Sequence, residues 1–181
     1  MLSTLPVGGG VLPNWKTYGA ETVVQPVPAL SEEEQYLQSS PYNFHPHLLD
    51  LSALTTPQSL LAQALTVTKS IRVDYATAPY SSAFNWDEVF DKLYSLVTAA
   101  DFHWDTQRYY VVVFRSCVQQ TTDLIELGKM DERSHAEANR SGGLLKYWFG
   151  VPDAEGRNLA TCRVFFSMKL SCWLFILIRV C

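Results

Sequence analysis

The fold is decided by one continuous stretch, RYYVVVFRSCVQQTTDLIELGKMDERSHAEANRSGGLLKYWF, which covers residues 108–149. Its first eight residues are β-branched or aromatic between two arginines, as is typical of a strand inside a sheet. Asp123 and Glu126 resemble a capping box and predict a helix that runs to Arg140. Two glycines then favour the end of that helix, because glycine readily adopts positive φ. A second strand is predicted over residues 144–149.

A turn and a third strand are predicted next. Residues 151–157 contain proline, aspartate and glycine, and residues 158–162 fit a strand. Strand, helix, strand and strand form the first part of a split β-α-β unit, which usually continues with a helix and a closing strand. We therefore predict an α+β fold, a ferredoxin-like antiparallel sheet with packed helices that is incomplete at the C-terminus.

Two helices are predicted on the N-terminal side of this unit. Thr56, followed by a proline, is typical of a helix start. A second helix fits residues 85–100, with Asn85 or the nearby Ser82 as its cap. Apolar residues form a stripe along it, and we assign its Trp86 and Phe90 to the core rather than to a cofactor platform.

Residues 1–50 are predicted to form a disordered or extended tail. They hold six prolines and a run of three glycines, and no apolar periodicity persists. His45 and His47 flank a proline there, but nothing nearby in the sequence completes a metal site.

The remainder, residues 51–181, is predicted to be a single α+β domain. Residues 51–104 are its helical portion, in which residues 71–75 alternate and fit a short strand. Residues 105–163 are the strand-helix-strand-strand unit, and residues 164–181 form an unusually apolar tail.

The composition excludes several classes of protein. A net charge of −4 argues against a nucleic-acid binder, because no basic excess exists to neutralise phosphates. The four cysteines show neither C-x-x-C nor zinc-ligand spacing, which argues against a disulfide scaffold and a metal site. The N-terminus lacks the pattern of a signal or transit peptide, so a cytoplasmic location is predicted. No phosphate-binding loop, dinucleotide fingerprint or catalytic-triad order is found, and no cofactor is expected.

The densest polar segment is residues 131–140. On a helix, Asp131, His135 and Asn139 share one face at i, i+4 and i+8. An aspartate one turn before a histidine can fix its tautomer and raise its pKa, which would make His135 a general base. The competing interpretation is a solvated helix face with ordinary ion pairs.

The strand that follows carries aromatic residues. Strict alternation places Leu145, Tyr147 and Phe149 on one face and Leu144, Lys146 and Trp148 on the other. One face would then line the core and the other a cavity or a partner surface, with Tyr147 and Trp148 as candidate substrate-binding walls. Arg115 could place a guanidinium where it meets a carboxylate or an enolate, or it could simply solvate a strand end.

Four segments resemble an uncharacterised family of small fungal proteins: YVVVFRS at 110–116, HAEA at 135–138, SGGLLKYWFG at 141–150 and RNLATC at 157–162. The likeness covers about residues 70–162. More loosely, the order of elements looks like the dimeric α/β barrels that include antibiotic-biosynthesis monooxygenases. That resemblance implies a hydrophobic small-molecule ligand between sheet and helices, a homodimer, and in several members no metal or organic cofactor.

After Cys162 the sequence departs from the family pattern, which would continue with a basic helix and a closing strand. Residues 164–181 are mostly apolar but short for the ~20 residues of a spanning helix. Three interpretations stay open: a membrane anchor, a buried strand or helix, or sequence foreign to the fold, as when translation enters an unspliced intron. The last would make this a truncated gene product and is the one we favour; a membrane is a partner only if the tail is genuine.

Two hypotheses about function follow. In the first, the protein binds a hydrophobic, enolisable small molecule as a cofactor-independent enzyme. His135 is then the base, held by Asp131, Arg115 meets the anion, and Asn139 contacts the substrate. In the second, it is a non-enzymatic interaction protein whose aromatic strand and open sheet edge pair with a partner or a second copy.

Overall fold

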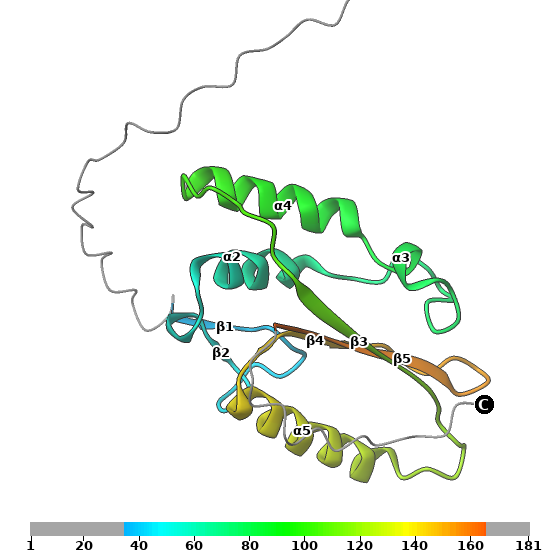
Figure 1. Cartoon of the computed structure of the whole chain (residues 1–181). Helices are drawn as coiled ribbons and strands as arrows, with labels where there is room; N and C mark the ends of the chain where they lie inside the picture. Colours follow the sequence, from blue (N-terminus) through cyan, green and yellow to red (C-terminus); the bar gives the residue numbers. More distant parts are fainter. Residues whose placement is uncertain (1–34, 166–181) are drawn as a thin grey trace, which may run out of the picture.

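The computed structural model describes residues 35–165, and residues 1–34 and 166–181 lie outside the described part (Figure 1). In chain order the elements are β1 (Tyr36–Leu37), β2 (Leu49–Asp50), η1 (Leu51–Ala53), α2 (Thr56–Ala64), η2 (Leu65–Val67), α3 (Tyr80–Ala83), α4 (Trp86–Ala99), β3 (Tyr109–Cys117), α5 (Leu124–Ser141), β4 (Leu144–Phe149) and β5 (Arg157–Phe165).

The larger sheet has three antiparallel strands in the order β3-β5-β4. Helix α5 lies on one side of it, and α2, α3 and α4 lie on the other (Figure 1). Strands β1 and β2 pair with each other as a separate small sheet. The predicted α+β class, with an antiparallel sheet and packed helices, is confirmed. The position of the third strand between the first two is compatible with a ferredoxin-like sheet.

Helix α5 begins and ends as its sequence predicts. The Asp123 carboxylate accepts the backbone N–H groups of Ile125 at 2.9 Å and Glu126 at 3.1 Å. Such a cap contributes about 1 kcal/mol to helix stability. Gly142 follows Ser141 with φ 79°, the left-handed conformation that glycine adopts without strain. The two ends of α5 are therefore fixed, and β4 begins three residues after the helix ends at Ser141.

Helix α4 matches the second predicted helix, and Asn85 occupies its N-cap position, but its side chain makes no cap hydrogen bond to the helix N–H groups. Its Oδ1 accepts the Lys69 N–H at 2.8 Å and its Nδ2 donates to the Val67 carbonyl at 3.0 Å, which ties the helix start to the end of η2. Val89 is buried, whereas Phe90 is 60% exposed. The assignment of Phe90 to the core is wrong, because the helix buries a narrower stripe than its apolar pattern suggests.

Helix α2 begins within one residue of its predicted start. Thr55, rather than Thr56, is the N-cap, and its backbone N–H donates to Oε1 of Gln58 at 2.9 Å. This is the side-chain-to-backbone half of a capping box.

A β-bulge in β4 breaks the predicted alternation. The pairing with β5 shifts register between Leu144 and Lys146. Leu144 consequently packs with Tyr147 in the core under α5, and Leu145 packs in the core under α2 and α4. Trp148 packs beside α3. The predicted faces of Leu144 and Leu145 relative to residues 146–149 are both wrong, since the extra residue inverts the alternation at that point.

Residues 35–50, assigned to the tail from sequence, take part in the fold. They form β1 and β2, and the Asp50 carboxylate accepts the Ser52 N–H at 2.9 Å to cap η1. The Tyr147 N–H donates to the Ser39 carbonyl at 3.0 Å, so this segment also contacts the outer edge of β4.

Two other sequence predictions need correction. Residues 71–75 form no strand, because residues 73–75 lie in turns and one isolated bridge joins Ser70 and Phe84 nearby. Strand β5 continues to Phe165, so the first two residues of the predicted tail 164–181 belong to the sheet. The rest of that tail lies outside the described residues.

Candidate functional site

One face of α5 carries the predicted polar residues toward the sheet. Asp131, His135 and Asn139 follow one another at one-turn spacing, and all three bond to residues outside the helix. Opposite them lie Tyr147 from β4 and residues 42–48, which we call the strap. The interpretation of this helix face as merely solvated is therefore wrong.

A pair of buried histidines forms the centre of the site. Nδ1 of His47, in the strap, lies 2.9 Å from Nδ1 of His135, and the two side chains are 2% and 3% exposed. One ring must donate and the other accept, because both Nδ1 atoms occupy the same hydrogen bond. Nε2 of His135 is buried and has no hydrogen-bond partner within residues 35–165.

Burial and the neighbouring His47 lower the pKa of His135 from 6.5 to about 4. Desolvation is the larger cause, because the imidazolium cannot regain its hydration in the core. His135 is consequently neutral near pH 7. This is opposite to the rise in pKa that Asp131 was expected to produce.

Asp131 serves two tyrosines instead of His135. Its Oδ2 accepts the hydroxyl of Tyr42 at 2.6 Å, and its Oδ1 accepts the hydroxyl of Tyr147 at 2.5 Å. Burial, together with the carboxylate, raises the pKa of both tyrosines far above the usual 10, so both stay protonated donors. The expected Asp131–His135 pair fails because two phenol donors satisfy the carboxylate.

The aromatic rings enclose the histidines. The ring centroid of Tyr42 lies 4.6 Å from that of His47, and the centroid of Tyr147 lies 5.5 Å from that of His135. Phe44 contacts His47 edge-on at 4.8 Å. Such contacts place the imidazoles in an apolar cage that favours their neutral form.

Asn139 holds the strap against the helix. Its Nδ2 donates to the carbonyls of Pro46 at 2.8 Å and Leu48 at 2.9 Å. These two bonds bracket His47 in the chain and fix its position over α5. In this structure Asn139 is a positioning residue rather than part of the histidine pair.

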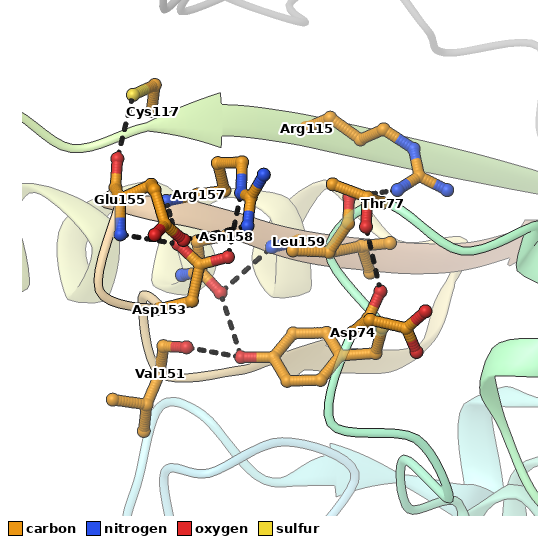
Figure 2. A network of polar contacts seen from close by, with 12 residues as sticks. Asp74, Thr77, Arg115, Cys117, Val151, Asp153, Glu155, Arg157, Asn158 and Leu159 are labelled. Carbon is orange, nitrogen blue, oxygen red and sulfur yellow. Dashed lines mark hydrogen bonds and ion pairs between the residues drawn. The ribbon is translucent and has the colours of Figure 1, made fainter.

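Arg115 and Trp148 lie on the opposite face of the sheet. Arg115 pairs in register with Leu159, and its guanidinium donates to the carbonyls of Ala76 and Ala78, in the loop before α3. Figure 2 shows Arg115 directed toward this loop. Trp148 packs on Phe84 with ring centroids 4.9 Å apart. The structure thus brings together Asp131, His135, Asn139 and Tyr147, but not these two.

The strand end near Arg115 has its own polar network, at the β4–β5 hairpin (Figure 2). The Arg157 guanidinium bridges the carboxylates of Asp153 and Glu155, each at 2.8 Å. Asp153 also accepts the Arg157 N–H at 2.8 Å. These exposed pairs fix the hairpin, and surface ion pairs of this kind contribute at most about 1 kcal/mol.

Cys162 packs beside Tyr147 in the core under α5. Burial raises the pKa of its thiol to about 12, so it is protonated and unreactive near pH 7. Within residues 35–165 no group of three or more metal-ligating side chains is found. No helix in that range has the length and apolarity needed to cross a membrane.

Sequence reasoning missed Tyr42 and His47. Both lie in the proline-rich segment that was assigned to the tail, and local pattern gives no sign that it packs on a helix 88 residues away. The available signal was the aromatic and histidine content of residues 42–47, which is unusual for a solvated tail.

The fold and this site define an α+β protein with a buried histidine, tyrosine and aspartate cluster between a helix and an N-terminal strap. The chain belongs to the PB2B2.08-like family, whose model matches residues 38–166. That range includes the strap and every residue of the cluster.

A relative in fission yeast, Schizosaccharomyces pombe, is UPF0643 protein PB2B2.08. It is 39% identical over an alignment of 137 residues, and the match covers 72% of this chain and 62% of the relative. The matched part thus spans less than two thirds of that relative. The resemblance to an uncharacterised fungal family is confirmed, and neither name states an activity. No solved structure matches this chain.

Proposed function

We propose that the protein binds a hydrophobic, enolisable small molecule beside His135 and moves a proton on it without a cofactor. The observation that supports this is the neutral, buried imidazole of His135, whose Nε2 has no partner within the described residues. An unpartnered buried nitrogen costs about 1–3 kcal/mol, so a site that retains one has a reason to do so.

The histidine pair supports a specific proton path. When His135 donates through Nδ1 to His47, its Nε2 carries a lone pair and can accept a proton. A C–H bond next to the ligand's carbonyl would break, the proton would pass to Nε2, and the electron pair would stay on the ligand as an enolate. Return of the proton to another carbon completes an isomerisation that needs no oxidant or reductant.

Entry of the ligand requires the strap to move. Nε2 of His135 is enclosed, and the strap that covers the cluster is held by two hydrogen bonds from Asn139. Phe44, at the outer side of the strap, is half exposed. Opening of the strap at Phe44 would admit an apolar ligand and leave the hydrogen bond between Tyr147 and Asp131 in place.

The experiment measures, by proton NMR in D₂O, how fast solvent deuterium replaces the C–H protons next to the carbonyl in a panel of hydrophobic ketones. The wild-type protein should accelerate exchange next to the carbonyl, and His135→Gln should abolish the acceleration while the ketone still binds. His103→Gln is the matched control, because His103 is 92% exposed and remote from the cluster in sequence. Failure of every ketone to bind, or unchanged exchange in His135→Gln, would refute the proposal.

The alternative proposal is association through the sheet. Of the aromatic side chains of β4, Tyr147 is buried and Trp148 half-buried inside the fold, and Phe149 is 38% exposed. The other outer strand, β3, would have to supply the edge. A homodimer formed there would show a doubled mass in light scattering, and a monomeric mass at all concentrations would exclude it. A cytoplasmic location belongs to both proposals.

A further inference from the structure

We propose that Lys146 and Arg163 form a second site, which binds a small anion bearing a carboxylate or a phosphate, on the face of the sheet covered by α2, α3 and α4. This inference is independent of the proposed function, because β4 and β5 alternate and the histidine cluster lies on the opposite face.

The two cations are adjacent and buried. Lys146 on β4 pairs in register with Arg163 on β5, and directly opposed residues of antiparallel strands share a face. Lys146 is 7% exposed and Arg163 is 4% exposed. Lysine and arginine are almost never buried to this extent unless they are paired with an anion.

Arg163 is positioned but not neutralised. Its Nη2 donates to the hydroxyl of Tyr80 at 2.8 Å, and that hydroxyl lies 3.0 Å from Oγ1 of Thr161. Its guanidinium carbon lies 4.5 Å from the ring centroid of Trp86, a cation–π contact. Nη1 is buried and has no hydrogen-bond partner within residues 35–165. The fixed guanidinium therefore keeps donors that an oxyanion would satisfy.

No carboxylate of the described chain compensates these charges. The ion pairs found within residues 35–165 include neither Lys146 nor Arg163. Burial and the neighbouring Arg163 lower the pKa of Lys146 from 10.5 to about 8. Lys146 therefore remains largely protonated near pH 7. Two positive charges then lie on directly opposed, buried residues of neighbouring strands. That arrangement is costly unless an anion joins it.

The chemistry of the donors sets the ligand class. Arg163 offers planar N–H groups that match a carboxylate or phosphate, and Lys146 offers a compact ammonium beside it. Tyr80 and Trp86 contact Arg163 with a hydroxyl and a ring face, and neither carries a charge near pH 7. A single oxyanion is thus the expected occupant.

The test is thermal unfolding of the full chain with increasing inorganic phosphate or acetate, in chloride of matched ionic strength. Either probe should raise the Tm of wild type. The probe that acts at the lower concentration shows whether the site prefers a phosphate or a carboxylate. Lys146→Met removes one cation without leaving a cavity and should weaken binding at least about tenfold, measured by calorimetry. Lys69→Met, which alters an exposed lysine paired with Glu88, should bind as wild type does.

Two results would overturn the inference. One is a Tm that rises no more with phosphate and acetate than with chloride. The other is equal binding by wild type and Lys146→Met, which would place the anion elsewhere on the surface. Arg163→Lys gives a second check if Lys146→Met fails to fold, because it keeps the charge and loses the planar donors, so binding should again weaken.

Discussion

Acid should destabilise this protein through His135, and the size of the effect follows from its burial. The unfolded chain takes up a proton at this histidine near pH 6.5, whereas the folded chain resists until about pH 4. The unfolded state therefore binds more protons between these values, and the free energy of unfolding falls as the pH falls through this window. Each unit of pKa difference corresponds to 1.36 kcal/mol, so the pKa shift of His135 contributes about 3 kcal/mol to the free energy of unfolding. The contribution is fully present above pH 6.5 and lost by about pH 4.

The assay is urea unfolding at several pH values between 7.5 and 4 for wild type and His135→Gln. The variant lacks the titrating ring, so its free energy of unfolding should fall by about 3 kcal/mol less over this range. Carboxylates contribute equally to both proteins and cancel in the comparison. His47 shares the buried hydrogen bond with His135, so His47→Gln should be measured as well.

His103→Gln serves as the control and should keep the wild-type pH dependence, because its side chain is 92% exposed. The reasoning is refuted if His135→Gln and wild type lose stability in parallel, within about 1 kcal/mol, the uncertainty of the extrapolation. NMR gives a direct check, since the imidazole signals of His135 should not titrate between pH 7 and 5.

Three further substitutions have defined outcomes. Asp131→Asn keeps the side-chain shape but replaces one of the two acceptor oxygens with an NH2 donor, so one tyrosine hydroxyl loses its acceptor, and it should cost about 1–3 kcal/mol in urea unfolding. Asn139→Ala should speed amide exchange in the strap far more than in β5, because it frees the strap's carbonyls; equal effects in both would show that the strap is not held locally. Gly156→Ala should destabilise by several kcal/mol, since φ is +78° and a Cβ would collide with the Val118 carbonyl; a loss under about 1 kcal/mol would contradict this.

The elements that sequence predicts well are those with local signals. The cap at Asp123 and the glycine at 142 define α5, and the β-branched run in β3 defines its strand. Each signal acts over a few residues, so it can be read without knowing the fold. The same locality explains the correct alignment of Asp131, His135 and Asn139 on one helix face.

The missed features depend on contacts between distant segments. The strap is ordered by α5, and His47 meets His135 across 88 residues of chain. Asp131 has three potential partners in space, and only one of them, His135, is close in sequence. Sequence spacing favours His135 as the partner, whereas the two tyrosine hydroxyls are the groups that bond to Asp131 in the fold. Long-range competition of this kind leaves no periodic pattern to read.

The bulge in β4 decides which polar group reaches which side of the sheet. With strict alternation, Leu144 would share a face with Lys146, and Tyr147 would share a face with Leu145. The register shift inverts this relation, so Tyr147 joins Leu144 under α5 while Lys146 lies opposite Arg163 on the other face. Without the extra residue, the ammonium of Lys146 would enter the histidine cluster and Asp131 would lose a tyrosine partner.

The same irregularity therefore accounts for both polar sites, because it separates a neutral histidine cluster from a pair of cations only one residue away in the strand. A one-residue change of register would exchange their positions and place a cation beside His135, where burial already disfavours positive charge. The bulge therefore positions the side chains of the strand and is not a defect in its pairing.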